Sequence, residues 1–186
     1  MHSDDILAKA QAVRLVVFDV DGVLTDGGLY FGDDGQEYKA FHSRDGHGMK
    51  MLLRSGVDIA VITGRTSRVV IHRMANLGVQ HVYQGQTDKL PAFLSLLHKL
   101  GLESRQAAFA GDDVVDLPIM LQAGFAVAVQ DAHPLVKERA HWCTPHGGGR
   151  GAARDLCEFI MEAQGTLQDQ LSRYLVSTSA QTDSLS

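Results

Sequence analysis

The sequence predicts an α/β fold built on a parallel sheet, and two of its features carry this prediction. Short apolar runs of strand length recur along the chain, and stretches of helical length separate them. Parallel strands require such crossover segments, because the chain must return to the same end of the sheet before the next strand begins. Glycines precede several of the apolar runs, at positions that suit the end of a helix.

Five apolar runs are predicted to form the sheet. The first, Leu15 to Phe18, is apolar throughout, which is typical of a parallel strand buried on both faces. In chain order the predicted strands are residues 15–18, 57–62, 79–83, 107–110 and 125–129. Leu, Met and Ala at helical spacing predict the helices, which are residues 48–55, 67–77, 89–100, 114–123 and 152–163. The resulting architecture is Rossmann-like, with helices flanking the sheet.

Residues 27–42 interrupt this alternation. Leu29-Tyr30-Phe31 and the run from Gln36 to Phe41 flank the turn sequence Gly32-Asp33-Asp34-Gly35. Two short strands around a turn of this composition predict a small β-hairpin that protrudes from the sheet.

Length and charge limit the possible functions. The 186 residues suffice for one domain with a full core, predicted over residues 1–176, and the polar residues 177–186 are predicted to form a disordered tail. Seventeen Lys and Arg against 22 Asp and Glu give a net charge of -5, so no nucleic acid or membrane partner is expected. No secretory leader and no apolar run of about 18 residues is present, which indicates a cytoplasmic protein. Cys143 and Cys157 are interpreted as buried thiols.

An acidic pair follows the first predicted strand. Asp19 and Asp21 stand two residues apart at the carboxyl end of a buried strand, where open α/β sheets bind their ligands. Two carboxylates this close repel each other unless a proton or a cation lies between them. A divalent metal is the simplest solution, although an acidic turn after a strand has the same pattern.

Polar groups also follow three further predicted strands. The second strand runs into Thr63-Gly64-Arg65, which offers a hydroxyl, a glycine backbone and a guanidinium to a phosphate group. Lys89 opens the helix after the third strand, and Gly111-Asp112-Asp113 ends the fourth, with Asp116 one helical turn later. One of these carboxylates is expected to cap a helix. Together the groups converge on one crevice, which predicts a site that handles phosphate.

In this order, the motifs resemble those of the haloacid dehalogenase superfamily of aspartyl-phosphate phosphohydrolases. Further stretches extend the resemblance over nearly the whole chain, toward phosphatases of acidic sugar phosphates. These stretches are residues 42–46, 61–65, 83–86, 111–113, 131–134 and 148–151. The resemblance implies Mg²⁺-dependent hydrolysis of the 8-phosphate of an eight-carbon 3-deoxy sugar acid, through an aspartyl phosphate, in lipopolysaccharide biosynthesis.

The resemblance assigns a role to each catalytic residue. Asp19 is the expected nucleophile, and Asp21 the expected general acid and base. Thr63 and Lys89 are expected to hold the phosphoryl oxygens. The expected Mg²⁺ ligands are Asp19, the backbone carbonyl of Asp21, and Asp112, and the expected supporting residues are Asp113 and Asp116.

The resemblance also implies a substrate-binding set that is rich in cations. An acidic sugar phosphate carries both a carboxylate and a phosphoryl group, and arginine and lysine suit both. The expected set is Asp21, His42, Ser43, Arg44, Asp45, Gly46, Lys50, Arg65, Arg73, Lys89 and Arg150.

Related functions share parts of this residue pattern. A phosphatase for a nonulosonate 9-phosphate, or a non-catalytic scaffold of the same fold, remains an alternative. A signalling receiver domain carries its phosphoacceptor Asp after strand three, where this chain has Tyr83-Gln84-Gly85. A dehalogenase would lack an acid at the position of Asp21, and a phosphomutase usually needs a cap domain to exclude water.

No cap domain is expected here. Where relatives insert caps, this chain has only the hairpin at residues 27–42 and the short connection Gly85 to Asp88. An open crevice would admit water, so we expect a homotetramer in which neighbouring chains cover the site. Pairing of the apolar hairpins would bury their side chains. The resemblance adds that Gly147 to Gly151, with Arg150, reaches a neighbour's site.

Overall fold

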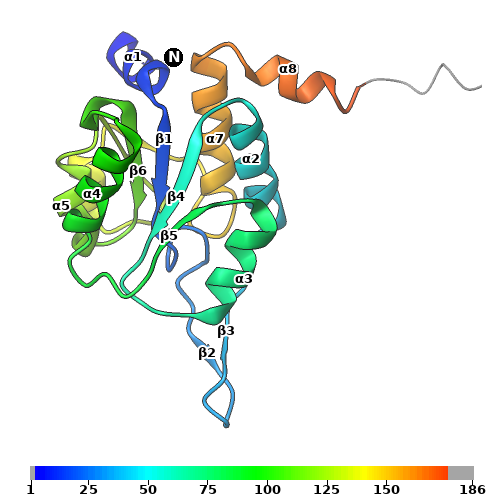
Figure 1. The fold of residues 1–186 in the computed structure, drawn as a ribbon, viewed down its shortest axis with the longest axis vertical. Coiled ribbons are helices and arrows are strands. Elements are labelled where there is room, and N and C mark those ends of the chain that lie inside the picture. Colours follow the sequence, from blue (N-terminus) through cyan, green and yellow to red (C-terminus); the bar gives the residue numbers. More distant parts are fainter. Residues whose placement is uncertain (1–2, 176–186) are drawn as a thin grey trace, which may run out of the picture.

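The computed structural model describes residues 3–175, and its main sheet is parallel as predicted (Figure 1). The six strands lie in the order β5-β4-β1-β6-β7-β8. Their bounds are β1 Leu15–Phe18, β4 Asp58–Ile62, β5 His81–Tyr83, β6 Ala107–Gly111, β7 Phe125–Ala128 and β8 Trp142–Cys143. Val17 of β1 pairs with Ala60 on one side and Phe109 on the other. The α/β fold is confirmed, and β8 is a strand that the sequence analysis missed.

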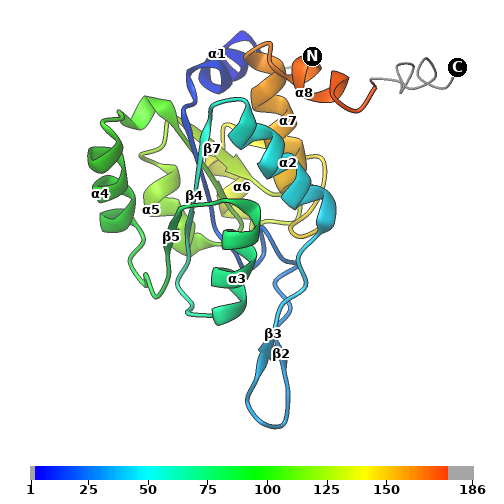
Figure 2. The same ribbon diagram turned by 45° about the vertical axis from the view of Figure 1, so that its right-hand side comes forward.

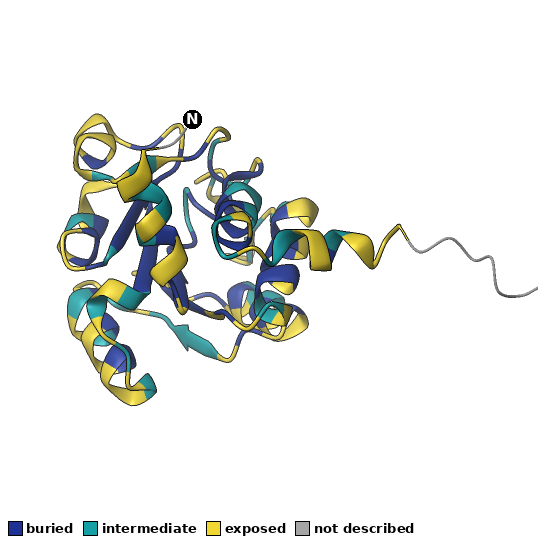
Figure 3. Ribbon diagram, turned by 90° about the horizontal axis from the view of Figure 1, so that it is seen from above, coloured by how far each residue is buried: buried dark blue, intermediate teal, exposed yellow. Residues whose placement is uncertain are grey.

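Helices cover both faces of the sheet (Figures 1 and 2). Helices α4 Leu90–Leu100 and α5 Leu117–Met120 lie on one face, and α2 Ser43–Arg54, α3 Arg68–Leu77 and α7 Ala152–Ala163 lie on the other. The other helical segments are α1 Asp4–Ala12, α6 Pro134–Arg139, α8 Leu167–Ser172 and two 3₁₀ turns, Ser104–Gln106 and Val114–Asp116. Seen from above, the strands are mostly buried and the outer surfaces of the helices are exposed (Figure 3). Among residues 3–175, no helix is long and apolar enough to cross a membrane.

Two helices differ from the prediction for local reasons. Helix α2 begins at Ser43, ahead of the predicted residue 48, and its glycines allow close packing on α7. A Cβ at Gly48 would lie only 3.1 Å from the Cα of Arg154. The predicted helix 114–123 is a 3₁₀ turn followed by α5, because Pro118 lacks an N–H and is tolerated only in a first helical turn.

The predicted hairpin is confirmed and projects from one end of the molecule (Figures 1 and 2). Its strands are β2 Tyr30–Phe31 and β3 Glu37–Tyr38, and Tyr30 pairs with Tyr38. Leu29, Tyr30, Phe31 and Tyr38 each expose half or more of their surface. A two-stranded ribbon with this much apolar exposure has little to stabilise it in water by itself.

The two cysteines differ in their exposure to solvent. Cys157 in α7 is buried, but Cys143 is exposed, so the prediction of two buried thiols is wrong for Cys143. The reason is that β8 is the edge strand of the sheet, which leaves Cys143 without a neighbouring strand on its outer side. The tail predicted over residues 177–186 lies outside the described residues.

Candidate active site

A cleft of about 480 Å³ opens at the carboxyl ends of the central strands. Four strands, β1, β4, β5 and β6, each deliver residues to it, as expected at this edge of a doubly wound sheet. Its lining residues are Asp19, Asp21, Thr63, Gly64, Arg65, Gln86, Thr87, Lys89, Asp112, Asp113 and Val115. The convergence predicted from the strand ends is therefore confirmed.

Lys89 lies between two carboxylates at the floor of this cleft. Its Nζ lies 2.8 Å from Asp19 Oδ1 and donates a 2.6 Å hydrogen bond to Asp116 Oδ1. Burial by itself would lower the pKa of Lys89, but the two carboxylates outweigh it and raise that pKa. Lys89 is therefore a fixed cation that is buried beside Asp19.

Even with this cation, the site has an excess of negative charge. Oxygens of Asp19, Asp112 and Asp116 all lie within 4.8 Å of one another. Desolvation, reinforced by the Asp116 charge, raises the pKa of Asp19 to about 6. Desolvation together with the charges of Asp19 and Asp116 raises the pKa of Asp112 to about 7. Ionisation of all three carboxyl groups together is therefore disfavoured unless a further cation joins them, because neighbouring negative charge raises the pKa of Asp19 and of Asp112.

The carboxylate cluster fits a hard divalent cation. Mg²⁺ prefers oxygen ligands and would offset the excess charge of Asp19 and Asp112. Gly22 in the loop after β1 leaves room for the Asp112 carboxylate, because a Cβ there would overlap it. Asp116 is already engaged, since it accepts hydrogen bonds from Lys89 and from the backbone N–H of Asp112. Asp116 therefore holds the backbone of Asp112 in position.

Asp113 and Thr63 are held by their strand ends. The Asp113 carboxylate accepts a 2.8 Å hydrogen bond from the N–H of Val114 and so caps the 3₁₀ turn. Thr63 continues β4: its N–H donates to the carbonyl of Tyr83, and its own carbonyl accepts from the N–H of Gln86. Since Thr63 is 2% exposed and lines the cleft, its position is set by the backbone on both sides.

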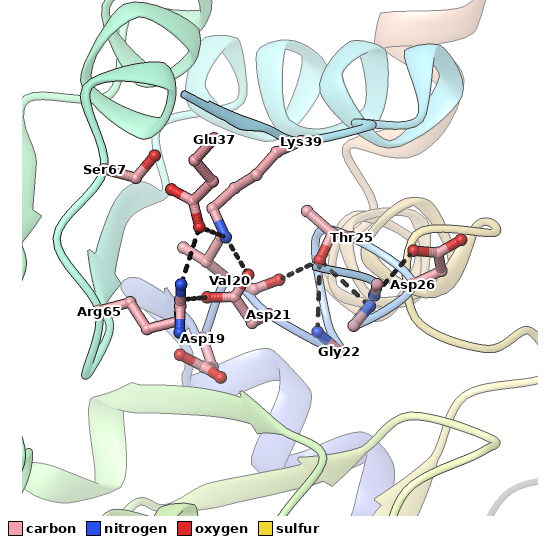
Figure 4. A network of polar contacts seen from close by, with 12 residues as sticks. Asp19, Val20, Asp21, Gly22, Thr25, Asp26, Glu37, Lys39, Arg65 and Ser67 are labelled. Atoms are coloured by element: carbon pink, nitrogen blue, oxygen red, sulfur yellow. Dashed lines mark hydrogen bonds and ion pairs between the residues drawn. The ribbon is translucent and has the colours of Figure 1, made fainter. Parts of the chain in front are cut away.

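Two hairpin residues that the sequence analysis missed contact Asp21 and Arg65 (Figure 4). Lys39 donates a hydrogen bond to Asp21 Oδ1 and forms an ion pair with Glu37 at 3.3 Å. Glu37 also accepts a 3.0 Å hydrogen bond from Arg65. Alternation along a strand places residues 37 and 39 on one face, while the apolar Tyr38 points the other way. The alternation in the sequence could have placed Glu37 and Lys39 on one face of the hairpin. It could not have shown that this face turns toward the cleft.

Comparison with known proteins agrees with this geometry. Residues 79–154 match the haloacid dehalogenase-like hydrolase family. The chain is 48% identical over 167 residues to the 3-deoxy-D-manno-octulosonate 8-phosphate phosphatase of Escherichia coli K12, covering 90% of this chain and 89% of the relative. The chain belongs to this phosphatase family. Its fold is the haloacid dehalogenase-like fold of those enzymes.

Solved structures of the same family match closely. The phosphatase from Moraxella catarrhalis, solved with a magnesium ion, a phosphate ion and the sugar acid KDO, has a TM-score of 0.91 at 39% identity and covers 93% of this chain and 99% of that one. The 3-deoxy-D-manno-octulosonate 8-phosphate phosphatase from Yersinia pestis has a TM-score of 0.88 at 47% identity, covering 89% of each chain.

The residues predicted to bind substrate fall into two groups, according to whether they line the cleft. Asp21, Arg65 and Lys89 line the cleft. The second group lies at the start of α2 and on α3, and it borders separate hollows; it comprises His42, Ser43, Asp45, Gly46, Lys50 and Arg73. Arg44 is exposed on the same first turn of α2. Within one chain the structure does not bring the second group to the catalytic carboxylates.

Arg73 and Asp45 show what holds the second group in place. The Arg73 guanidinium lies 5.8 Å from the centre of the Phe41 ring. Asp45 is 2% exposed and accepts hydrogen bonds from the N–H groups of Gly151, at 3.3 Å, and Arg154, at 2.9 Å. The Asp45 carboxylate therefore joins the start of α2 to the first turn of α7. Its contact with substrate stays a prediction.

The Gly-rich segment packs on its own chain. The N–H of Gly149 donates a 2.9 Å hydrogen bond to the carbonyl of Val23, in the loop that follows Asp21. A Cβ at Gly148 would lie 1.7 Å from the carbonyl oxygen of Gly22, so only glycine allows this contact. The expectation that this segment reaches a neighbour's site stays a prediction. Arg150 is 71% exposed in its side chain, pairs with Asp26 at 3.3 Å, and does not line the cleft.

Proposed function

We propose that this protein is a Mg²⁺-dependent phosphatase that hydrolyses 3-deoxy-D-manno-octulosonate 8-phosphate to the sugar acid and inorganic phosphate, in the cytoplasm, as a step of lipopolysaccharide biosynthesis. One observation carries the proposal: Asp19, Asp21, Thr63, Lys89 and Asp112 lie around one cleft. Membership of the phosphatase family supports the choice of substrate. Neither nucleic acid nor membrane takes part in the reaction.

Asp19 and Asp21 divide the chemistry between them. A carboxylate oxygen of Asp19 forms a bond to phosphorus while the bond from phosphorus to the sugar oxygen breaks, and the Asp21 carboxyl gives its proton to that oxygen. Water then attacks phosphorus, passes a proton back to Asp21, and frees the Asp19 carboxylate and phosphate. Lys89 is held 2.8 Å from Asp19 and supplies positive charge for the phosphoryl oxygens. Thr63 offers a hydroxyl at the next strand end.

The metal would be held by Asp19, Asp112 and the backbone carbonyl of Asp21. When bound, Mg²⁺ offsets the repulsion between the carboxylates and the phosphate dianion. Asp116 keeps Asp112 in place through the Asp112 N–H. Asp113 would support the site through its cap on the 3₁₀ turn.

The cations and polar groups outside the cleft would bind the sugar acid. Arg65 lines the cleft, while Arg44, Lys50 and Arg73 gather on α2 and α3 with the segment from His42 to Gly46. Since the two groups are separate within one chain, a site formed by two chains would unite them. In that arrangement Arg150 would approach substrate from its exposed position.

We therefore propose a homotetramer. The exposed Leu29, Tyr30, Phe31 and Tyr38 of the hairpin supply an apolar surface of the kind that is buried between subunits. Light scattering of the purified protein should give about four times the mass of one chain. A fully active monomer would contradict the tetramer while leaving the chemistry intact.

A substrate panel tests the proposed activity. Phosphate release should be fastest with the eight-carbon sugar acid 8-phosphate, slower with a nonulosonate 9-phosphate, and slower still with neutral sugar phosphates. A preference for the nine-carbon substrate would reassign specificity within the same chemistry. If no phosphate ester releases phosphate in the presence of Mg²⁺, the protein is a non-catalytic scaffold of this fold.

A further inference from the structure

Lys39 does not line the catalytic cleft itself, but its ammonium contacts Asp21, which does. Its side chain is 1% exposed, and its ammonium lies between the carboxylates of Asp21 and Glu37. A buried cation between two carboxylates is held firmly, because leaving either one would strand an uncompensated charge. Lys39 therefore fixes one side of Asp21 without touching the space where a phosphate ester would bind.

The two oxygens of Asp21 are not equivalent as a result. Oδ1 accepts the hydrogen bond from Lys39. Oδ2 is buried and accepts no hydrogen bond from any residue between 3 and 175, and Arg65 Nε lies 3.9 Å from it. Figure 4 shows Oδ2 on the Arg65 side, and both residues line the cleft. A buried oxygen without a partner is costly unless a ligand completes it.

Glu37 keeps this arrangement rigid. It holds Lys39 at 3.3 Å and Arg65 at 3.0 Å, and a hydrogen bond from Ser67 is the largest cause of its lowered pKa. Ser67 precedes α3, so Glu37 anchors the hairpin to the main domain as well as to the cleft. The carboxylate of Asp21 is therefore oriented by a chain of contacts that begins outside the active site.

We propose that Lys39 is a positioning residue for the phosphatase reaction: by binding Oδ1 of Asp21, it leaves Oδ2 as the oxygen that exchanges the proton with the leaving group and with water. This rests on the proposed function. In the first step the proton moves from Oδ2 to the sugar oxygen as the phosphorus to oxygen bond breaks. In the second step a water proton returns to Oδ2 as phosphorus gains the water oxygen and releases Asp19.

The test separates these two steps by the choice of ester. p-Nitrophenolate leaves without a proton, so with p-nitrophenyl phosphate only the second step needs Asp21. In Lys39→Met we expect the rapid release of the first equivalent of p-nitrophenol to stay within about threefold of wild type, while the steady-state rate falls roughly 10- to 100-fold. For the sugar phosphate, kcat should fall by at least as much, with KM changed less than kcat.

Matched variants make the result decisive. Lys99→Met, at an exposed position on α4, should match wild type in both phases. Lys39→Arg should recover part of the steady-state rate, because it restores a cation beside Oδ1. Equal loss in the rapid and steady phases would overturn the proposal, as would unchanged kinetics in Lys39→Met.

A second substitution covers the case in which Lys39→Met fails to fold. If Lys39→Met does not fold, Lys39→Gln is measured by the same criteria, and failure of both to fold would give Lys39 a purely structural role and overturn the proposal. The p-nitrophenyl phosphate measurements do not depend on which sugar is the substrate. Inactivity of the wild-type protein toward the sugar phosphate would therefore count against the proposed function alone.

Discussion

The Asp112 carboxylate occupies the space next to the Cα of Gly22: a Cβ at position 22 would lie 2.1 Å from Asp112 Oδ2. Gly22 also has a φ of +92°, a conformation that side chains disfavour. The glycine after Asp21 is therefore required by a residue from a different strand end.

We predict that Gly22→Ala displaces Asp112 and weakens Mg²⁺ binding about 10- to 100-fold, the range seen when a metal ligand loses its support. Titration of activity with Mg²⁺ measures the change. The matched control is Gly101→Ala, which has a φ of +66° but no atom within 4 Å of the added Cβ. It should lose stability through backbone strain and keep its Mg²⁺ requirement. Equal Mg²⁺ affinity in the two variants would refute the contact as the cause.

Asp19→Asn should abolish turnover of every ester, because an amide is neither a nucleophile nor an adequate metal ligand. Asp21→Asn should retain more activity on p-nitrophenyl phosphate than on the sugar phosphate, since the activated leaving group needs no proton. Steady-state rates of both variants on both esters measure this. Normal hydrolysis by the Asp19 variant would show that another residue is the nucleophile.

The carboxylate cluster predicts how pH and metal act on stability. Asp19 and Asp112 have pKa values of about 6 and about 7, raised from 3.8 by desolvation and neighbouring charge. The folded protein thus binds protons more tightly than the unfolded chain, so these groups lower the free energy of unfolding as pH rises from about 4 to 7. Mg²⁺ binds the ionised form, so its stabilising effect should grow over the same range.

Thermal unfolding at pH 5 and pH 8, with EDTA and with Mg²⁺, measures this effect. EDTA should also abolish activity, and added Mg²⁺ should restore it. Asp112→Asn is the control, because removal of one carboxyl should reduce both the pH dependence and the metal effect. Full activity in EDTA would refute the metal's role, and an identical Mg²⁺ effect at both pH values would refute the titration of the cluster.

Asp45→Ala should destabilise the protein by about 1 to 3 kcal/mol, because it leaves the N–H groups of Gly151 and Arg154 without their acceptor. At about 2 to 4 °C per kcal/mol for a chain of this size, calorimetry resolves the shift in Tm. Asp5→Ala, at an exposed position in α1, should shift Tm little. A lowered sugar-phosphate affinity at unchanged Tm would instead indicate a substrate contact.

Arg150→Ala should raise KM for the sugar phosphate while leaving Tm nearly unchanged, because the Arg150 side chain is largely exposed and its ion pair with Asp26 is at the surface. Kinetics at saturating Mg²⁺ measure the effect. Unchanged KM would remove Arg150 from the substrate site without affecting the tetramer.

The sequence alone predicted the catalytic set because parallel strands bring their carboxyl ends to one edge. Asp19, Thr63 and Asp112 each follow a recognisable apolar run, so their meeting required only the fold class. Lys89 required one more step, since it precedes α4.

The contacts that the sequence does not predict are ones that no local pattern encodes. Lys39 and Glu37 act through the direction in which the hairpin leaves the domain. Asp45 meets Gly151 across 106 residues of sequence, where periodicity carries no information. The apolar neighbours of Cys143 predict a buried thiol, but its exposure at the sheet edge depends on strand order.

The packing of Gly148 and Gly149 on the loop after Asp21 bears on how the enzyme is made. The nucleophile emerges early in synthesis, but the segment that supports its loop follows more than 100 residues later. Contacts between segments this distant in sequence are slow to form, because a long loop must close before they are made. A nascent or prematurely ended chain therefore carries Asp19 without a finished catalytic loop, and hydrolytic competence arrives only with the completed domain.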